Sequence, residues 1–219
     1  MALMAAPAMA QTGHVGLSYS TNDDADIEAI TIEGASTFAF SPSIGAQVDG
    51  SFGSVDGGGD DATAWDLNGH LFYNAGAWRV GGLFGTAGLD TDGGEPSATH
   101  WGVEGVYWFE RVALSASVIW GEGDYVISPS LDYSNYDFNA DFYATDNFVI
   151  GATYGVGTID NGGSEADTTS YSIDAEWQLS SMPISLLAGF QHWEIDGIPV
   201  ESEGWTVGAR WNWGGTLAE

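Results

Sequence analysis

Hydrophobic and polar residues alternate along almost the whole chain from residue 13 onward, and helical periodicity is nearly absent. A period of two is typical of β-strands that have one apolar face and one polar face. Glycine-rich or acidic stretches interrupt the alternation at regular intervals. The pattern predicts about 12 strands, with pairing of only 10 left open. The predicted strands cover residues 13–20, 29–40, 43–54, 64–74, 77–87, 99–109, 111–121, 135–144, 147–158, 169–179, 183–193 and 204–213.

The two faces keep the same character from strand to strand. In the predicted strand over 64–74, Trp65 and Leu67 share one parity, whereas Asp66 lies on the other. The last predicted strand, WTVGARWNWGG, likewise has its tryptophans on one parity and Arg210 on the other. An apolar face of this kind has to be covered, either by the core of a soluble sandwich or by the hydrocarbon of a membrane.

Short and long connections alternate between the predicted strands. The short ones include NAGA at 74–77 and ER at 110–111, and the long ones, such as VDGGGDDAT and LDTDGGEPSA, are rich in acids and glycine. Successive antiparallel strands would collect the short turns at one end of the sheet and the long loops at the other. A β-sandwich also has short alternating strands, but this difference between the two ends favours a barrel.

The combined pattern is that of a membrane-spanning barrel, with antiparallel strands about ten residues long, apolar outside and polar inside. Over residues 13–213 the chain resembles Gram-negative outer-membrane β-barrel proteins of the porin-like group. The resemblance implies an all-β fold, a closed antiparallel up-and-down transmembrane barrel with short periplasmic turns and long acidic extracellular loops. It also implies a location in the outer membrane of a Gram-negative bacterium, surrounded by outer-membrane lipid. Such barrels typically end on an aromatic residue, whereas GGTLAE follows Trp213 here.

The two ends of the chain differ in composition from the alternating region. The first residues, MALMAAPAMA, are small and apolar and end in an A-x-A pattern, which is typical of the cleavage site of a secretory signal peptide. We expect residues 1–10 to be the remnant of a signal peptide, residues 11–213 to form a single barrel domain, and residues 214–219 to be a short C-terminal extension. No run of apolar residues is long enough for a membrane-spanning helix.

The charge balance narrows the function classes. The chain has 31 acidic residues and only 3 basic ones, Arg79, Arg111 and Arg210, so its formal net charge is −28. Nucleic acid is excluded as a partner, because binding to phosphates needs clustered lysine and arginine. The sequence contains no cysteine, so neither disulfides nor thiolate metal sites are available.

Charged residues on the polar parity are the candidates for the lining of the barrel lumen. Carboxylates outnumber arginines among them, and rings of acidic side chains favour cations over anions. Twelve strands should enclose a narrower space than the broad channels of barrels with sixteen or more strands. Small inward residues such as Gly16, Gly81 and Gly85 predict some open space inside. The expected lumen charges are Glu33, Asp49, Asp66, Arg79, Glu104, Asp137, Asp141, Asp174, Glu176 and Arg210.

Aromatic residues on the apolar parity are candidates for contact with the lipid interface, where Trp and Tyr are enriched. Many of them lie near the ends of predicted strands. The expected interfacial aromatics are Trp65, Tyr73, Trp78, Trp101, Tyr107, Trp120, Tyr171, Trp177, Trp205, Trp211 and Trp213.

These features predict a narrow channel for passive diffusion of small solutes or ions, with a weak preference for cations. The alternative is a non-conducting barrel that serves structure or surface contact through its acidic loops. A hydrolase of the Ser/His/acid type is a third, less favoured hypothesis. Its histidine would be His192 on the apolar parity, or His14 or His70 on the polar parity, and no flanking motif selects one of them.

One acidic segment, DTDGGE, resembles part of a calcium loop, because oxygen ligands alternate along it and glycine allows a bend. Its candidate ligands are Asp90, Asp92 and Glu95. The full twelve-residue pattern of such loops is absent, so a simple acidic turn is favoured over a firm metal site. The sequence therefore predicts no cofactor, and only loose binding of divalent cations at the loops.

Overall fold

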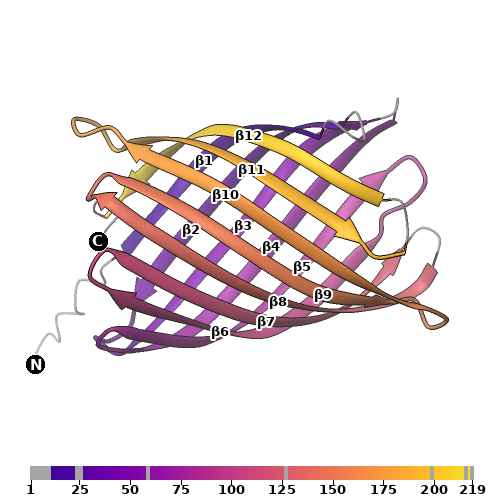
Figure 1. Cartoon of the computed structure of the whole chain (residues 1–219), viewed down its shortest axis with the longest axis horizontal. Helices are drawn as coiled ribbons and strands as arrows, with labels where there is room; N and C mark the ends of the chain where they lie inside the picture. Colours follow the sequence, from indigo (N-terminus) through magenta and orange to yellow (C-terminus); the bar gives the residue numbers. More distant parts are fainter. Residues whose placement is uncertain are drawn as a thin grey trace, which may run out of the picture.

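The computed structural model describes residues 11–22, 27–57, 60–125, 128–197, 200–214 and 217. Each strand pairs antiparallel with the next one along the chain, and β12 pairs with β1 to close the barrel (Figure 1). The predicted closed antiparallel β-barrel is therefore confirmed, with twelve strands. The strands are β1 (Gln11–Asn22), β2 (Ile27–Ala39), β3 (Ile44–Gly57), β4 (Asp60–Ala75), β5 (Trp78–Thr91), β6 (Ser97–Phe109), β7 (Val112–Tyr125), β8 (Ser128–Thr145), β9 (Phe148–Asp160), β10 (Glu165–Gln178), β11 (Ile184–Ile195) and β12 (Val200–Trp213).

The expected signal-peptide remnant over 1–10, and residues 215–216 and 218–219 of the expected C-terminal extension, lie outside the described residues. Among the residues that are described, no helix is long and apolar enough to cross a membrane.

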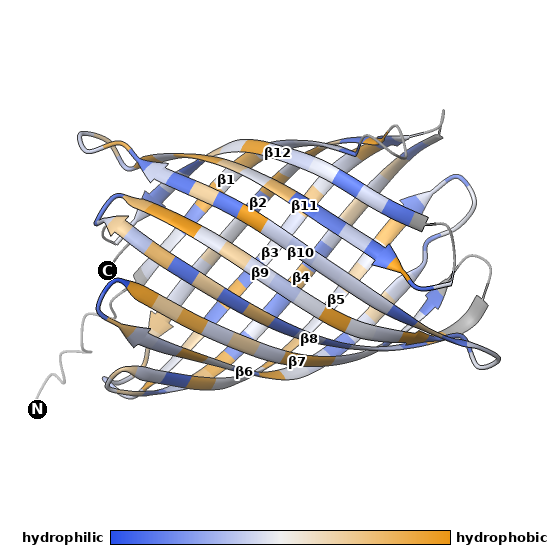
Figure 2. Ribbon diagram, viewed as in Figure 1, coloured by the Kyte–Doolittle hydropathy of each residue, from blue (hydrophilic) through white to orange (hydrophobic). Residues whose placement is uncertain are grey.

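The distribution of buried side chains distinguishes the barrel from a sandwich. Within the described ranges, the buried hydrophobic side chains are Phe72 and Ala113 alone, whereas Leu71 is 61% exposed and Trp205 59% exposed. A sandwich would bury its apolar faces between two sheets. Apolar and polar residues follow one another along the strand ribbons in Figure 2. The apolar face of this sheet is turned outward, and the surrounding that it requires is hydrocarbon.

The strands extend beyond the predicted bounds at one end of the barrel. We call this end the acidic end, and the end with the connections after β2, β4, β6, β8 and β10 the turn end. The strand β4 begins at Asp60 where the alternation predicted residue 64, and β8 begins at Ser128 where it predicted residue 135. The predicted long loops are therefore largely strand, and the intervals between strands are short at both ends. The alternation of apolar and polar residues ends where the hydrocarbon ends. The hydrogen-bonded pairing of the strands continues beyond it, because in water neither face of the sheet has to be apolar.

Many carboxylates that we expected in loops accordingly lie on the extended strand ends. These residues lie in paired strands; for example, Asp56 of β3 pairs with Asp61 of β4. They are Glu28, Asp56, Asp60, Asp61, Asp90, Glu122, Asp124, Asp132, Asp160, Glu165, Asp167, Glu194, Glu201 and Glu203. Three others from the first predicted loop, Asp23, Asp24 and Asp26, lie outside the described residues.

Two-residue turns connect several strands at the turn end. The β4–β5 and β6–β7 turns each begin with a residue of positive φ, Gly76 at 66° and Glu110 at 52°. A positive φ at the first turn residue matches the twist of antiparallel strands, as in type II′ hairpins. Arg111 in the second of these turns donates to the carbonyl oxygens of Tyr143 and Ala144 at 3.2 and 2.8 Å. This contact ties the β6–β7 turn to the neighbouring β8–β9 hairpin.

Candidate functional site: the inner wall of the barrel

Side chains that meet across an intervening strand identify the inner wall. Arg210 on β12 reaches Glu33 on β2 over β1, and it reaches Glu176 on β10 over β11. Such contacts form only on the concave side of a curved sheet. The exposed tryptophans of β12, among them Trp205 and Trp211, have the opposite parity. All ten charged residues expected in the lumen have the parity of the inner wall, and they alternate with outward residues of the same strands.

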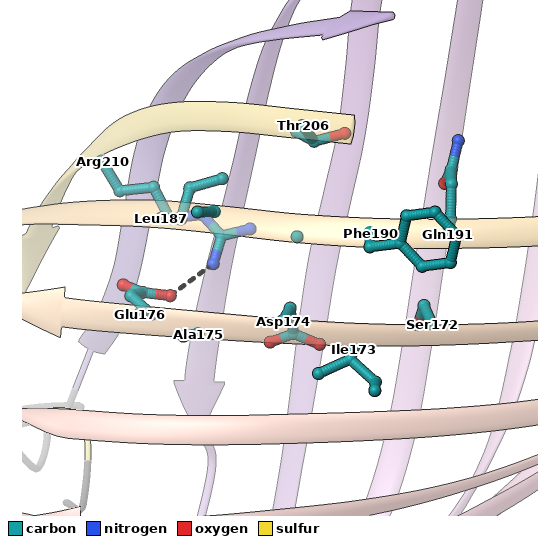
Figure 3. A pocket seen from close by; sticks show the side chains of 12 residues that line it. Ser172, Ile173, Asp174, Ala175, Glu176, Leu187, Phe190, Gln191, Thr206 and Arg210 are labelled. Atoms are coloured by element: carbon teal, nitrogen blue, oxygen red, sulfur yellow. Dashed lines mark hydrogen bonds and ion pairs between the residues drawn. The ribbon is translucent and has the colours of Figure 1, made fainter. Parts of the chain in front are cut away.

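Arg210 is held by two carboxylates, and Figure 3 shows its contact with one of them, Glu176. Its Nε donates to Glu33 Oε1 at 2.5 Å and its Nη1 donates to Glu176 Oε2 at 2.6 Å. Gly16 lies between Arg210 and Glu33 on β1, and a β-carbon at this position would stand 2.9 Å from each of them. The side chains of Arg210 and Glu33 are about a quarter exposed, at 27% and 26%. This guanidinium is therefore already neutralised by the wall, and it offers little attraction to an anionic solute.

His70 makes a second bridge on the part of the wall that adjoins β2. Its Nδ1 lies 3.1 Å from Oε2 of Glu104 on β6, and its Nε2 lies 3.0 Å from Oδ1 of Asp49 on β3. Asp49 also accepts from Gln47 at 2.8 Å and from Asn68 at 3.1 Å. The sequence predicts that Asp49, His70 and Glu104 face inward, but it does not predict that they meet, because they lie on three different strands.

The inward glycines Gly81 and Gly85 leave room for these bridges, and not the open space that we expected there from the sequence. His100 Nε2 lies 2.8 Å from Asn68 Oδ1 across β5, and a β-carbon on Gly85 of that strand would overlap both atoms. Gly81 on the same strand would place a β-carbon 3.2 Å from Glu104 Oε1. The volume that these glycines free is therefore taken up by polar side chains of the neighbouring strands.

The Gly85→Ala variant is expected to lower the free energy of unfolding by about 1–3 kcal/mol, because it forces His100 and Asn68 apart in a packed wall. Urea titration of the barrel in detergent micelles would measure it. Gly69→Ala is the matched control, since Gly69 is exposed and a β-carbon there would meet only Phe84 O, at 3.9 Å. Equal destabilisation by both changes would contradict the proposed role of Gly85.

Four inner carboxylates have no cationic partner. Among the described residues, no ion pair within 4.0 Å involves Asp66, Asp137, Asp141 or Asp174. Two of them face each other across β9: a β-carbon on Gly151 would stand 2.9 Å from Asp141 Oδ1 and 2.8 Å from Asp174 Oδ1. Within the described residues, Asp137 and Asp141 on β8 and Asp174 on β10 therefore carry negative charge without a cation at ion-pair distance.

Asp174 also lines a recess of about 200 Å³ next to Arg210 (Figure 3). Its wall includes Glu176 and Thr206, so polar groups from β10 and β12 border the same space. The recess is open on one side, and a small hydrated solute could contact both the carboxylates and the guanidinium there.

Arg79, the other inward cation, is covered by aromatic rings at the turn end. Its guanidinium carbon lies 4.1 Å from the ring centre of Phe72 and 5.2 Å from that of Trp108, and its Nε donates to Asn74 at 3.0 Å. Sequence reasoning missed both rings as inner-wall residues. The run Leu71–Phe72–Tyr73 contains the signal, because three consecutive large apolar residues on a strand require the middle one to face inward.

The expected interfacial aromatics have the outward parity and form two groups by position along the strands. The ring of Trp78 lies 4.3 Å from that of Tyr107 near the turn end, and Trp205 lies 5.0 Å from Phe190 towards the acidic end. The turn-end group is Tyr73, Trp78, Tyr107, Trp177, Trp211 and Trp213, and the other group is Trp65, Trp101, Trp120, Tyr171 and Trp205.

The DTDGGE segment forms a tight connection between β5 and β6. The Thr91 hydroxyl donates to Gly94 O at 3.0 Å and accepts from Gly93 N at 3.2 Å. Asp90, Asp92 and Glu95 do not form a group of three potential ligands within 4.8 Å of one another. Over the described residues, such a group consists of His192, Glu201 and Glu203.

No protein-family model and no curated protein matches the chain. Solved structures of barrels do match it. OmpT of Vibrio cholerae, expressed in the outer membrane, is similar with a TM-score of 0.57 at 11% identity, covering 94% of this chain and 97% of its own. The KdgM porin in complex with disordered oligogalacturonate is similar with a TM-score of 0.61 at 7% identity, covering 91% and 99%. The translocator domain of the autotransporter NalP from Neisseria meningitidis has a TM-score of 0.55 at 12% identity, covering 93% and 88%.

At these identities the likenesses show the fold alone. The chain has the architecture of outer-membrane β-barrels, and it shares that architecture with porins and with an autotransporter translocator domain.

Proposed function

We propose that the chain is an outer-membrane barrel that acts as a narrow diffusion channel for small solutes or ions and prefers cations weakly. The observation that carries the proposal is the pair Asp141 and Asp174, whose carboxylates face each other over Gly151 and have no cation within ion-pair distance in the described part of the chain. The exposed apolar outer face supports the membrane location. The porin fold of a similar structure supports the transport function.

The imbalance between the two signs of charge supports cation preference. Both inward arginines are occupied: Arg210 by two carboxylates, and Arg79 by aromatic rings. An entering ion therefore meets unpaired carboxylates on β8 and β10, whereas both inward guanidinium groups already have partners. Acidic rings lower the energy of cations in a pore and raise that of anions.

The charge of the inner wall also indicates that this barrel and the KdgM porin differ in the solutes they accept. The KdgM porin was solved with oligogalacturonate, a chain of sugar carboxylates. An anionic oligosaccharide would be repelled by Asp137, Asp141 and Asp174 on the inner wall. We therefore propose small cationic or neutral solutes for this chain, and not acidic sugars.

The double variant Asp141→Asn/Asp174→Asn is expected to reduce cation preference, because it removes two negative charges from the wall with little change in side-chain volume. Single-channel recording in planar bilayers would show conductance steps with a zero-current potential closer to zero than that of the wild type. Asp167→Asn is the matched control, since Asp167 has the outward parity of β10 and is exposed. An unchanged potential in the double variant would exclude this pair as the source of selectivity.

A non-conducting barrel is the second candidate, and one feature favours it. Phe72, only 5% exposed, and Trp108 fill the inner wall near Arg79 at the turn end. If these rings block the lumen, wild-type protein will insert into bilayers without conductance steps, and the channel proposal fails.

A hydrolase is not favoured by the histidine contacts. Two of the three candidate histidines have described contacts, which go to carboxylates and not to a serine hydroxyl: His70 contacts Glu104 and Asp49, and His192 contacts glutamates. We therefore propose no catalytic role for the inner wall.

A further inference from the structure

The outer surface of the acidic end carries a cluster on two adjacent strands that the channel function does not use. His192 on β11 pairs directly with Glu203 on β12, and Glu194 pairs with Glu201 two positions further along. Directly opposite residues of an antiparallel pair have their β-carbons about 4.5–5.5 Å apart on the same face. These side chains share the outward parity of Tyr171, which pairs with His192 from β10. The cluster therefore lies outside the lumen, on a hydrogen-bonded part of the sheet.

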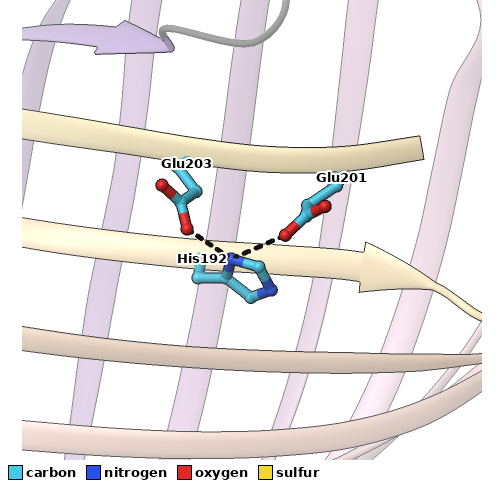
Figure 4. Close-up of side chains that lie close together, drawn as sticks. All are labelled: His192, Glu201 and Glu203. Carbon is cyan, nitrogen blue, oxygen red and sulfur yellow. Dashed lines mark ion pairs between the residues drawn. The ribbon is translucent and has the colours of Figure 1, made fainter. Parts of the chain in front are cut away.

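Three side chains converge in this cluster (Figure 4). Nδ1 of His192 lies 3.3 Å from Glu203 Oε1 and 3.9 Å from Glu201 Oε1. One ligand atom from each residue falls within 4.8 Å of the other two. One imidazole nitrogen and two carboxylate oxygens thus surround a single point, and each ligand comes from a strand and not from a mobile loop.

The state of His192 provides a second, independent observation. Its side chain is only 7% exposed, and within the described residues its Nδ1 atom makes no hydrogen bond. A buried polar atom without a hydrogen-bond partner is costly. This atom is the one that points towards Glu201 and Glu203, so a cation at that point would complete its coordination (Figure 4).

The neighbours of the ring fix its orientation. The imidazole stacks on Tyr171 with 4.6 Å between ring centres and an angle of 17°. On its far side, Nε2 lies 3.8 Å from Glu194 Oε2. A histidine that binds a metal through one nitrogen commonly directs its other N–H towards a carboxylate, which sets the tautomer and the ring orientation. The arrangement of Glu194, His192 and the two converging carboxylates has this form.

We propose that His192, Glu201 and Glu203 bind one divalent transition-metal cation of the zinc class on the outer surface of the barrel. Imidazole with two carboxylates is a donor set that suits zinc, whereas calcium prefers six to eight oxygen ligands. Three protein ligands leave a fourth position for water. The bound cation would join β11 to β12 beside their connection and would neutralise part of the negative charge that Glu201 and Glu203 bring together. The site does not depend on the channel proposal.

Calorimetric titration of the full chain with zinc chloride tests this site. The barrel would be refolded in detergent and freed of metal with a chelator, and saturable binding of one zinc ion per barrel is expected. The variant Glu201→Gln/Glu203→Gln keeps side-chain size and should weaken binding by more than about 100-fold, since changes in outer-shell partners alone cost about 10–100-fold. Asp56→Asn/Glu122→Gln is the matched control, because these carboxylates are exposed on other strand ends, and it should bind like the wild type.

A second variant distinguishes coordination of zinc by His192 from a general attraction of cations to the carboxylates. His192→Gln should weaken zinc binding strongly but leave weak calcium binding unchanged. Gel mobility with and without boiling shows which variants are folded. Absence of saturable zinc binding in the wild type, or undiminished binding in Glu201→Gln/Glu203→Gln, would overturn the proposal.

Discussion

Replacing Ala209 with arginine is expected to lower the free energy of unfolding from a lipid bilayer by about 2–4 kcal/mol, the cost of a cation on the lipid face at mid-depth. Ala209 is exposed on β12 and lies midway between Trp205 and Trp213. It pairs with two further outward residues, Leu17 on β1 and Leu186 on β11. The new charge would therefore lie in hydrocarbon without a partner.

Two controls make the Ala209 measurement specific. Ala209→Leu keeps the face apolar and should leave folding almost unchanged. Asp56→Arg places the same charge on the outward parity near the acidic end, where it should cost about 0–1 kcal/mol. Equilibrium unfolding with urea in phospholipid bilayers measures all three variants. Similar stability of Ala209→Arg and the wild type would show that this face of β12 does not contact lipid.

The Arg210→Met variant is expected to reduce stability and to increase cation preference together. Removing one partner of a buried ion pair costs about 3–5 kcal/mol, and the partial exposure of Arg210 and Glu33, 27% and 26%, lowers the expected loss to about 1–3 kcal/mol. Glu33 and Glu176 would then carry uncompensated charge on the wall. Urea unfolding gives the first effect, and the zero-current potential in a salt gradient gives the second.

Arg111→Met is the matched control for Arg210, because it removes the same charge from a turn outside the lumen. Arg111 is exposed and donates only to backbone carbonyls of the neighbouring hairpin in the described contacts. Its zero-current potential should equal that of the wild type. If both arginine variants shift the potential equally, selectivity follows total charge and not the arrangement on the wall.

The strands and their closure could be predicted because lipid imposes an alternation of apolar and polar residues on every strand that spans it. The strand ends could not. Beyond the hydrocarbon, both faces meet water, so the apolar signal ends although the ladder continues, as at Asp60 in β4 and at Ser128 in β8. For the same reason the alternation predicts a loop for Glu201 and Glu203, and it does not predict their pairing with β11.

The contacts on the inner wall depend on strand neighbours that parity does not reveal. Arg210 and Glu33 are separated by 177 positions, and they meet only because β12 closes against β1. Parity shows which side chains share a face, but the meeting of two of them depends on register and on a small residue such as Gly16 between them. The inward glycines therefore indicated open space in the sequence, whereas they accommodate side chains in the structure.

The zero-current potential of wild-type protein in a planar bilayer, across a tenfold gradient of potassium chloride, tests whether the barrel is a cation-preferring channel. We expect discrete conductance steps and a potential whose sign shows that potassium passes more readily than chloride, because the inner wall carries the unpaired carboxylates of Asp141 and Asp174. Insertion without conductance steps, or a potential of the opposite sign, would contradict it.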